Sequence, residues 1–263
     1  MAITTRDGLI AALSAKQLLA CTKASIAGAT GGYTSLLAAA GQPGAGSLSI
    51  GNTTSGVIPD DTLAGAFPFT NPTGGNKSYL ARVSFAVSVV GTLIIYDRLW
   101  HAGSFTAVNG NINTNGSAAL TRYTDGANVE LWAEINTGLN ATPVTLTATY
   151  TDQGGNNNQS ATVVIPASAV SARMFPFQLA AGDTGVRSIQ NLAGSAAPTG
   201  NFNLVLLRRI AEIPMGLAGV ASVLDFAQLG MPEVVNDACL CMMINTNTAN
   251  TGTLSGSMDL IQG

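Results

Sequence analysis

The stretch from Thr92 to Phe105, TLIIYDRLWHAGSF, contains the residue types that acid–base catalysis would need. It carries Asp97 and His101, and His101 is the only histidine in the 263 residues. Any triad or dyad that uses an imidazole must therefore use His101. Four residues of extended chain place Asp97 about 13 Å away, too far for its carboxylate to orient the ring. No G-x-S-x-G nucleophile motif occurs. We therefore expect His101 to be a packed residue at a strand end.

The same stretch is better suited to anchoring a fold. Tyr96 and Trp100 bring large apolar areas, and Asp97 with Arg98 forms an expected ion pair that sets a turn or holds a neighbouring chain. We interpret these four residues as structural anchors, and we expect no enzymatic activity from them.

Two carboxylates flank a tryptophan on one predicted strand: Glu130, Trp132 and Glu134 alternate with apolar residues and share a face. This pattern could form a sugar platform. Glycosidase carboxylates stand about 5 to 10 Å apart, however, whereas these backbone positions are about 13 Å apart. We favour a surface that faces a partner protein. Asp60 and Asp61 lack other oxygen ligands at the spacing of a calcium loop.

The three cysteines, Cys21, Cys239 and Cys241, could join His101 in a zinc site. Zinc knuckles usually have two or more residues between their cysteines, whereas Cys239 and Cys241 are separated by one. In a strand this spacing places both on one face as small apolar residues. We expect no metal and no cofactor, and leave open free thiols or an intermolecular bond.

The composition indicates a chain whose surface is covered by partners. Charged residues make up 10% of the sequence, where about a quarter is usual, and the net charge is −3. The balance gives no electrostatic reason to bind nucleic acid, and no segment approaches the about 18 apolar residues of a membrane span. The lipoprotein-like box that ends at Cys21 lacks an uninterrupted apolar run before it. We expect an intracellular, soluble product.

Residues 1–76 are expected to form an N-terminal helix and an extended arm. The spacing of Leu9, Ile10 and Leu13, with Asp7 as a cap, predicts a helix over roughly residues 7–25. The following stretch is rich in Gly, Pro, Ser and Thr and is too long for an ordinary connection. We expect its apolar residues to contact its own domain or a neighbouring subunit.

From residue 77 the hydrophobic pattern has a period of two, which predicts strands to the end of the chain. Short strands with Gly, Asn and Pro turns favour a mainly β, antiparallel, jelly-roll-like β-sandwich over residues 77–263. An irregular apolar insertion at about 211–236 is expected to include a short helix over Val220 to Gln228. Arg208 and Arg209 could bridge to an acidic neighbour. The candidate interface residues are Tyr33, Leu36, Leu37, Phe67, Phe69, Trp132, Arg208 and Arg209.

Three blocks carry a resemblance: TTRDGLIAAL, TLIIYDRLWHAGSF and FPFQLAAGDTGVRSIQ, the last from Phe175 to Gln190. They resemble structural proteins encoded among the head and tail genes of tailed bacteriophages, over most of the chain. The resemblance implies a virion component made in the host cytoplasm, and brings no catalytic residues. With this size, composition and arm, we expect a decoration or cement protein on the capsid surface. It would bind the major capsid protein and itself, most often as a trimer.

Two other functions stay open. One is a tail, baseplate or receptor-binding component, which exposure of Trp132 between Glu130 and Glu134 would favour. The other is a virion-associated polysaccharide hydrolase, which would need carboxylates from separate strands to converge in a cleft.

Overall fold

The period-two pattern of the sequence does form strands. In the computed structural model, which describes residues 3–112, 116–117 and 119–263, β4 (Ser78–Val87) and β8 (Val144–Asp152) bury alternate side chains over most of their length. The strand pairings that build the sheets are antiparallel. The prediction of a mainly β, antiparallel chain is therefore confirmed.

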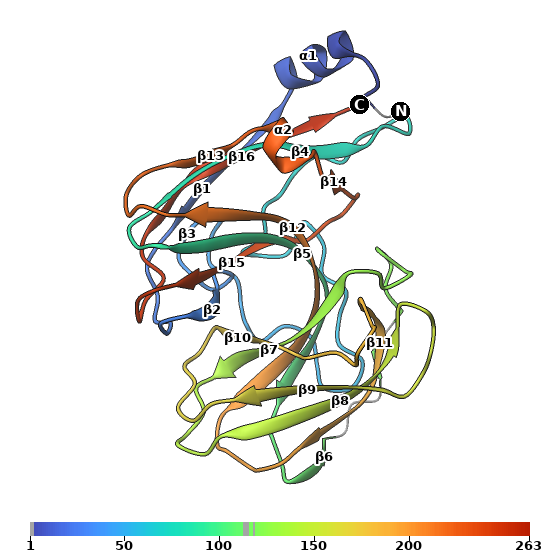
Figure 1. The fold of residues 1–263 in the computed structure, drawn as a ribbon, viewed down its shortest axis with the longest axis vertical. Helices are drawn as coiled ribbons and strands as arrows, with labels where there is room; N and C mark the ends of the chain where they lie inside the picture. Colours follow the sequence, from blue (N-terminus) through green and yellow to red (C-terminus); the bar gives the residue numbers. More distant parts are fainter. Residues whose placement is uncertain (1–2, 113–115, 118) are drawn as a thin grey trace.

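The strands form a closed barrel between two sheets (Figure 1). The upper sheet, at the end that carries both termini, has the order β13-β4-β16-β1-β3, with β14 also on β4. The barrel is β10-β2-β15-β5-β12-β7, and the lower sheet is β6-β11-β8-β9. The upper sheet contains β13 (Ser222–Leu224), β16 (Leu254–Gln262), β1 (Gln17–Lys23), β3 (Gly41–Gln42) and β14 (Glu233–Val234). The barrel contains β10 (Arg173–Pro176), β2 (Gly32–Ser35), β15 (Leu240–Thr246), β5 (Gly91–Phe105), β12 (Asn201–Met215) and β7 (Val129–Thr137). The lower sheet adds β6 (Gly110–Ile112), β11 (Val186–Gly194) and β9 (Gln159–Ile165).

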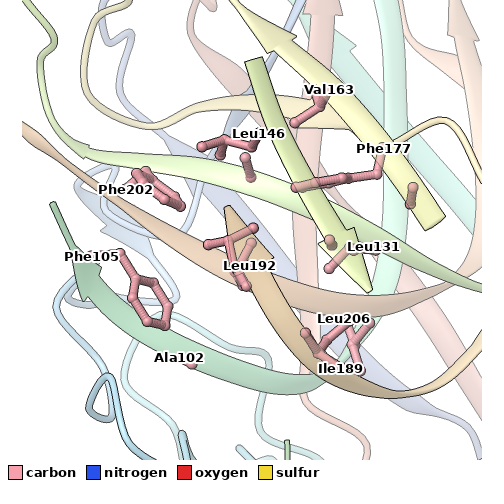
Figure 2. Close-up of a cluster of buried hydrophobic side chains, with 14 of the residues drawn as sticks. Ala102, Phe105, Leu131, Leu146, Val163, Phe177, Ile189, Leu192, Phe202 and Leu206 are labelled. Atoms are coloured by element: carbon pink, nitrogen blue, oxygen red, sulfur yellow. The ribbon is translucent and has the colours of Figure 1, made fainter. Parts of the chain in front are cut away.

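Two strands of 15 residues each, β5 and β12, pair along their length and connect the two halves of the molecule. One core lies between the upper sheet and the barrel wall, and includes Val83 and Leu93. A second fills the barrel, and a third lies between the barrel wall and the lower sheet, where Phe105, Phe202 and Leu192 meet (Figure 2). The chain thus has two sandwich cores that share the strands of one barrel.

The N-terminal helix is shorter than the sequence predicts. Helix α1 covers Arg6–Ser14, and its cap is Thr5, whose side chain accepts a hydrogen bond from the Gly8 backbone N–H, not Asp7. The rest of the predicted helix, from Gln17 on, is β1, which pairs with β16 over seven residues. Sheet pairing therefore overrides the helical spacing of the leucines, and the expected boundary at residue 76 does not separate the strands.

The expected arm folds onto its own chain. Its strand β2 closes the barrel between β10 and β15. The expected insertion at 211–236 is also partly regular, because β12 continues to Met215. The predicted helix over Val220 to Gln228 is reduced to α2 (Phe226–Leu229), with a capping box at Asp225. Neither helix of the described residues has the length and apolar character needed to cross a membrane.

Candidate functional site

Arg98 and His101 of β5 lie within the barrel, in a polar cluster with Glu134 of β7. Arg98 donates from Nη2 to Oε1 of Glu134 at 2.6 Å and from Nη1 to Oε2 at 3.0 Å, and both side chains are fully buried. Nη2 also donates to the Tyr96 hydroxyl at 3.1 Å, and Nη1 lies 2.6 Å from Nδ1 of His101. Asn203 donates to the Leu48 carbonyl at 2.8 Å.

The ionisation of this cluster is set by burial and by Arg98. Burial by itself would raise the pKa of Glu134, but the charge and hydrogen bonds of Arg98 hold that pKa below its usual range. Burial, with the nearby Arg98 cation, lowers the pKa of His101 to about 3. The cluster at neutral pH is thus a buried ion pair beside a neutral imidazole. All of its charged groups are enclosed, so no substrate reaches them in this structure.

Asp97 and Arg98 do not pair with each other, which corrects the expected ion pair. Asp97 accepts hydrogen bonds from Nε and Nη2 of Arg122, each at 2.9 Å, and from the Cys239 backbone N–H at 2.8 Å. The reason is geometric, since consecutive side chains of a strand point to opposite faces. No turn exists at this point because β5 continues to Phe105. Tyr96, Asp97, Arg98 and Trp100 are all buried.

The two tryptophans are also internal. Trp100 donates a hydrogen bond from Nε1 to the Ser55 carbonyl at 2.9 Å, which connects β5 to the loop that contains Ser55. Trp132 belongs to the core of the barrel. Its Nε1 donates a hydrogen bond to Glu130 at 2.8 Å, and its ring meets that of Tyr33 edge-on, with the ring centroids 5.1 Å apart. Trp132 lies on the face opposite Leu131 as predicted, but barrel closure buries both faces of β7. Trp132 is therefore no exposed sugar platform.

Most candidate interface residues of the arm are core residues of their own chain. Leu36, Leu37, Phe67 and Phe69 are buried, while Tyr33 is half-buried against Trp132. Arg208 and Arg209 are half-buried at the surface, and Arg209 pairs with Glu130 at 2.6 Å. The scattered apolar residues of this irregular segment thus pack into the core of their own chain.

In the part of the chain that the structure describes, the cysteines are not grouped with other metal-binding side chains. Cys21, Cys239 and Cys241 are buried and free, and the Sγ atoms of Cys239 and Cys241 are 3.9 Å apart. Burial raises the pKa of the Cys21 thiol to about 12. Within the described residues no three His, Cys, Asp or Glu side chains are close enough together to hold a metal ion.

One surface hollow of about 370 Å³ brings together two carboxylates from distant segments, Asp60 and Asp237. Asp60 accepts hydrogen bonds from the backbone N–H and the hydroxyl of Thr62, and Asp237 accepts one from Asn71 at 2.5 Å. Asp60 thereby fixes its own turn. Asp237 joins the segment before β15 to the segment that contains Asn71. These internal hydrogen bonds explain both positions without a substrate.

Several exposed apolar side chains lie close together in the sequence, in the segment after β12 that contains β13 and the first residue of α2. Leu217 is 67% exposed, Val220 55%, Val223 44% and Phe226 38%. We call these four residues the 217–226 patch. They are four of the ten large apolar side chains exposed among the described residues. All four lie in the apolar insertion that the sequence predicts at about 211–236, whereas Met215 of the same stretch is buried.

The sequence matches no protein-family model and no curated protein. Among solved structures, it is weakly similar to the Gt strain of infectious bursal disease virus (9% identity, 94% of this chain, 81% of that chain, TM-score 0.17). The VP2 subviral particle of the same virus gives 8% identity, 94% and 80% coverage, and a TM-score of 0.19. The VP1 pentamer of human polyomavirus 6 is 11% identical, with 94% of each chain covered and a TM-score of 0.18. At these TM-scores no common fold and no function follows from the likeness.

Proposed function

We propose that this chain is a structural virion protein of a tailed bacteriophage that binds the outside of the capsid and reinforces the shell. The observation that carries the proposal is the 217–226 patch. Four exposed apolar side chains within ten residues are costly in water and are typical of a surface that another protein covers. The partner proposed for it is the major capsid protein, with homo-oligomers, most often trimers, as the bound form.

The build of the molecule supports a mechanical role. The upper and lower sheets are joined through β5 and β12, so the two halves share strands and not only a linker. Arg98, His101 and Glu134 are enclosed in the barrel, where the Arg98–Glu134 ion pair links β5 and β7. A rigid block with one adhesive surface gains affinity when many copies bind a repeating lattice.

The two alternative functions lose the features that would favour them. An exposed Trp132 between Glu130 and Glu134 would favour a receptor-binding component. Trp132 and Glu134 are instead buried. A polysaccharide hydrolase needs free carboxylates in a cleft, and those of Asp60 and Asp237 are engaged with Thr62 and Asn71. We therefore keep the proposal that the chain is not an enzyme.

The experiment that tests the proposal has two parts. Light scattering of the purified protein should give a discrete oligomer. Co-sedimentation with expanded capsids that lack the protein should saturate at a fixed number of copies per capsid. A protein that stays monomeric and does not sediment with such capsids would contradict the proposal.

A further inference from the structure

A second surface hollow, of about 340 Å³, lies between β12, the segment before β7 and the segment before β15. Arg208 and Tyr123 line it together with Ile210, Pro232, Glu233, Val235 and Arg209. Its volume falls within the range of about 300 to 1,000 Å³ typical of ligand pockets. We call it the Arg208 pocket. It lies apart from the buried cluster and carries both apolar walls and charged groups.

Arg208 has no acidic partner among the described residues, in contrast to Arg209 beside it in the same pocket. Arg122 pairs with Asp97 and Arg209 with Glu130, but no carboxylate of the described residues lies within ion-pair distance of Arg208. Its guanidinium stacks on the Tyr123 ring at 4.6 Å and donates from Nη1 to the Ala127 carbonyl. The edge formed by Nε–H and Nη2–H has no acceptor among the described residues. This edge is the fork that binds a carboxylate with two parallel hydrogen bonds.

Tyr123 provides a second unused donor at the same pocket. Its hydroxyl is buried and has no hydrogen-bond partner among the described residues. Burial, and then the charge of Asp97, raises the pKa of Tyr123 to about 12, so the hydroxyl keeps its proton at neutral pH. A buried hydroxyl without a partner costs free energy, which a bound acceptor would recover.

We propose that the Arg208 pocket binds a single carboxylate, that of a Glu or Asp side chain on a partner protein, with Arg208 and Tyr123 as its donors. That this partner belongs to the virion rests on the proposed function. The stacked tyrosine holds the guanidinium plane in place, so less side-chain entropy is lost on binding. Ile210, Pro232 and Val235 offer apolar contact to the methylene groups of the ligand.

The charges around the pocket favour a carboxylate over a phosphate or a nucleic acid. Glu233 lines the pocket and is paired with Lys77 at 2.6 Å, and Arg209 is neutralised by Glu130. One uncompensated positive charge, that of Arg208, thus remains. A monoanion matches it, whereas a dianion or a polyanion would carry more charge than Arg208 neutralises and would be opposed by the net charge of −3.

The test uses the full chain and two peptides that differ only in charge, acetyl-Ala-Glu-Ala-amide and acetyl-Ala-Gln-Ala-amide, at constant ionic strength. Titration is followed by the NMR signal of the Arg208 Nε–H. We expect saturable shifts with the Glu peptide and none with the Gln peptide. Arg208→Lys, which keeps the charge but not the fork, should weaken binding about tenfold, and Arg208→Gln should abolish it.

Tyr123→Phe keeps the stacked ring and removes only the hydroxyl, so it tests the site even if Arg208 variants disturb the loop. We expect about tenfold weaker binding. Arg6→Gln, at an exposed arginine of α1, is the matched control and should change nothing. Equal response to both peptides, binding that survives Arg208→Gln, or inorganic phosphate binding more tightly than the Glu peptide would each overturn the proposal. Because no capsid takes part, this test can fail independently of the decoration role.

Discussion

Arg98 and Glu134 face each other inside the barrel, joined by hydrogen bonds of 2.6 and 3.0 Å, and neither side chain has any exposed surface. They come from β5 and β7, which do not pair with each other but both pair with β12. The ion pair thus links two strands across a third. Removing one partner would leave the other as an uncompensated charge in the interior.

Glu134→Gln should therefore destabilise the protein strongly. We expect a loss of about 3 to 5 kcal/mol in the free energy of unfolding, measured by urea denaturation. The control is Glu130→Gln, because the Glu130–Arg209 pair is about one-third exposed (33% and 32%). Its loss should be under about 1 kcal/mol. Equal effects of the two substitutions would show that the enclosed pair has no special role in stability.

The single histidine predicts an acid sensitivity that begins above the range of the carboxylates. The folded pKa of His101 is about 3, whereas an unfolded histidine has a pKa of about 6.5. Between these values the unfolded chain binds the extra proton, so stability rises with pH and falls on acidification. We expect a loss of about 2 kcal/mol from pH 7.5 to pH 5.

His101→Asn should flatten this dependence, since no other histidine titrates in the chain. Urea denaturation of both proteins at pH 7.5, 6 and 5 measures it. Under the proposed function the same variant should still bind capsids, because the buried His101 side chain cannot contact a partner. An unchanged pH slope would contradict the buried, neutral state of His101.

Local alternation was sufficient to predict much of the sheet structure. In β8 the threonines at 145, 147, 149 and 151 alternate with buried apolar residues, as a strand with one covered face requires. The same rule placed Trp132 opposite Leu131. It could not tell that both faces of β7 are covered, because this depends on barrel closure by β2 and β10.

The site residues were found by type but not by partner. Asp97 meets Arg122 and Arg98 meets Glu134, which lie 25 and 36 residues away in the sequence, and only the tertiary fold brings them together. Alternation alone excludes an Asp97–Arg98 pair within one strand. The sequence predicts a helix over residues 17–23, because their pairing with the last strand of the chain leaves no local signal in the sequence.

Trp100→Ala should cost about 3 to 5 kcal/mol, because the indole is 1% exposed and its removal leaves a cavity. It also leaves the Ser55 carbonyl without its donor. Gly56→Ala tests the same contact from the other side. A Cβ there would lie 2.6 Å from Trp100 Nε1, and Gly56 has a φ of +67° that other residues rarely adopt. Thermal unfolding measures both, and a Trp100→Ala protein as stable as the wild type would contradict this account.

The double substitution Leu217→Ser and Val220→Ser tests the 217–226 patch. Both side chains are mostly exposed, so the free energy of unfolding should change by under about 1 kcal/mol. The affinity for capsids should fall at least tenfold, because every copy bound to the lattice loses the same apolar contact area. Co-sedimentation at increasing protein concentration measures the affinity and the number of copies bound.

Val164→Ser is the matched control, since Val164 is 64% exposed but lies on β9, in the lower sheet. It removes exposed apolar area at the opposite end of the molecule, from one side chain and not two, and so controls for a general loss of surface hydrophobicity. If the patch is the capsid contact, Val164→Ser binds like the wild type while the double variant does not. If both variants bind equally well, the patch has another role, and the capsid contact must be sought elsewhere on the surface.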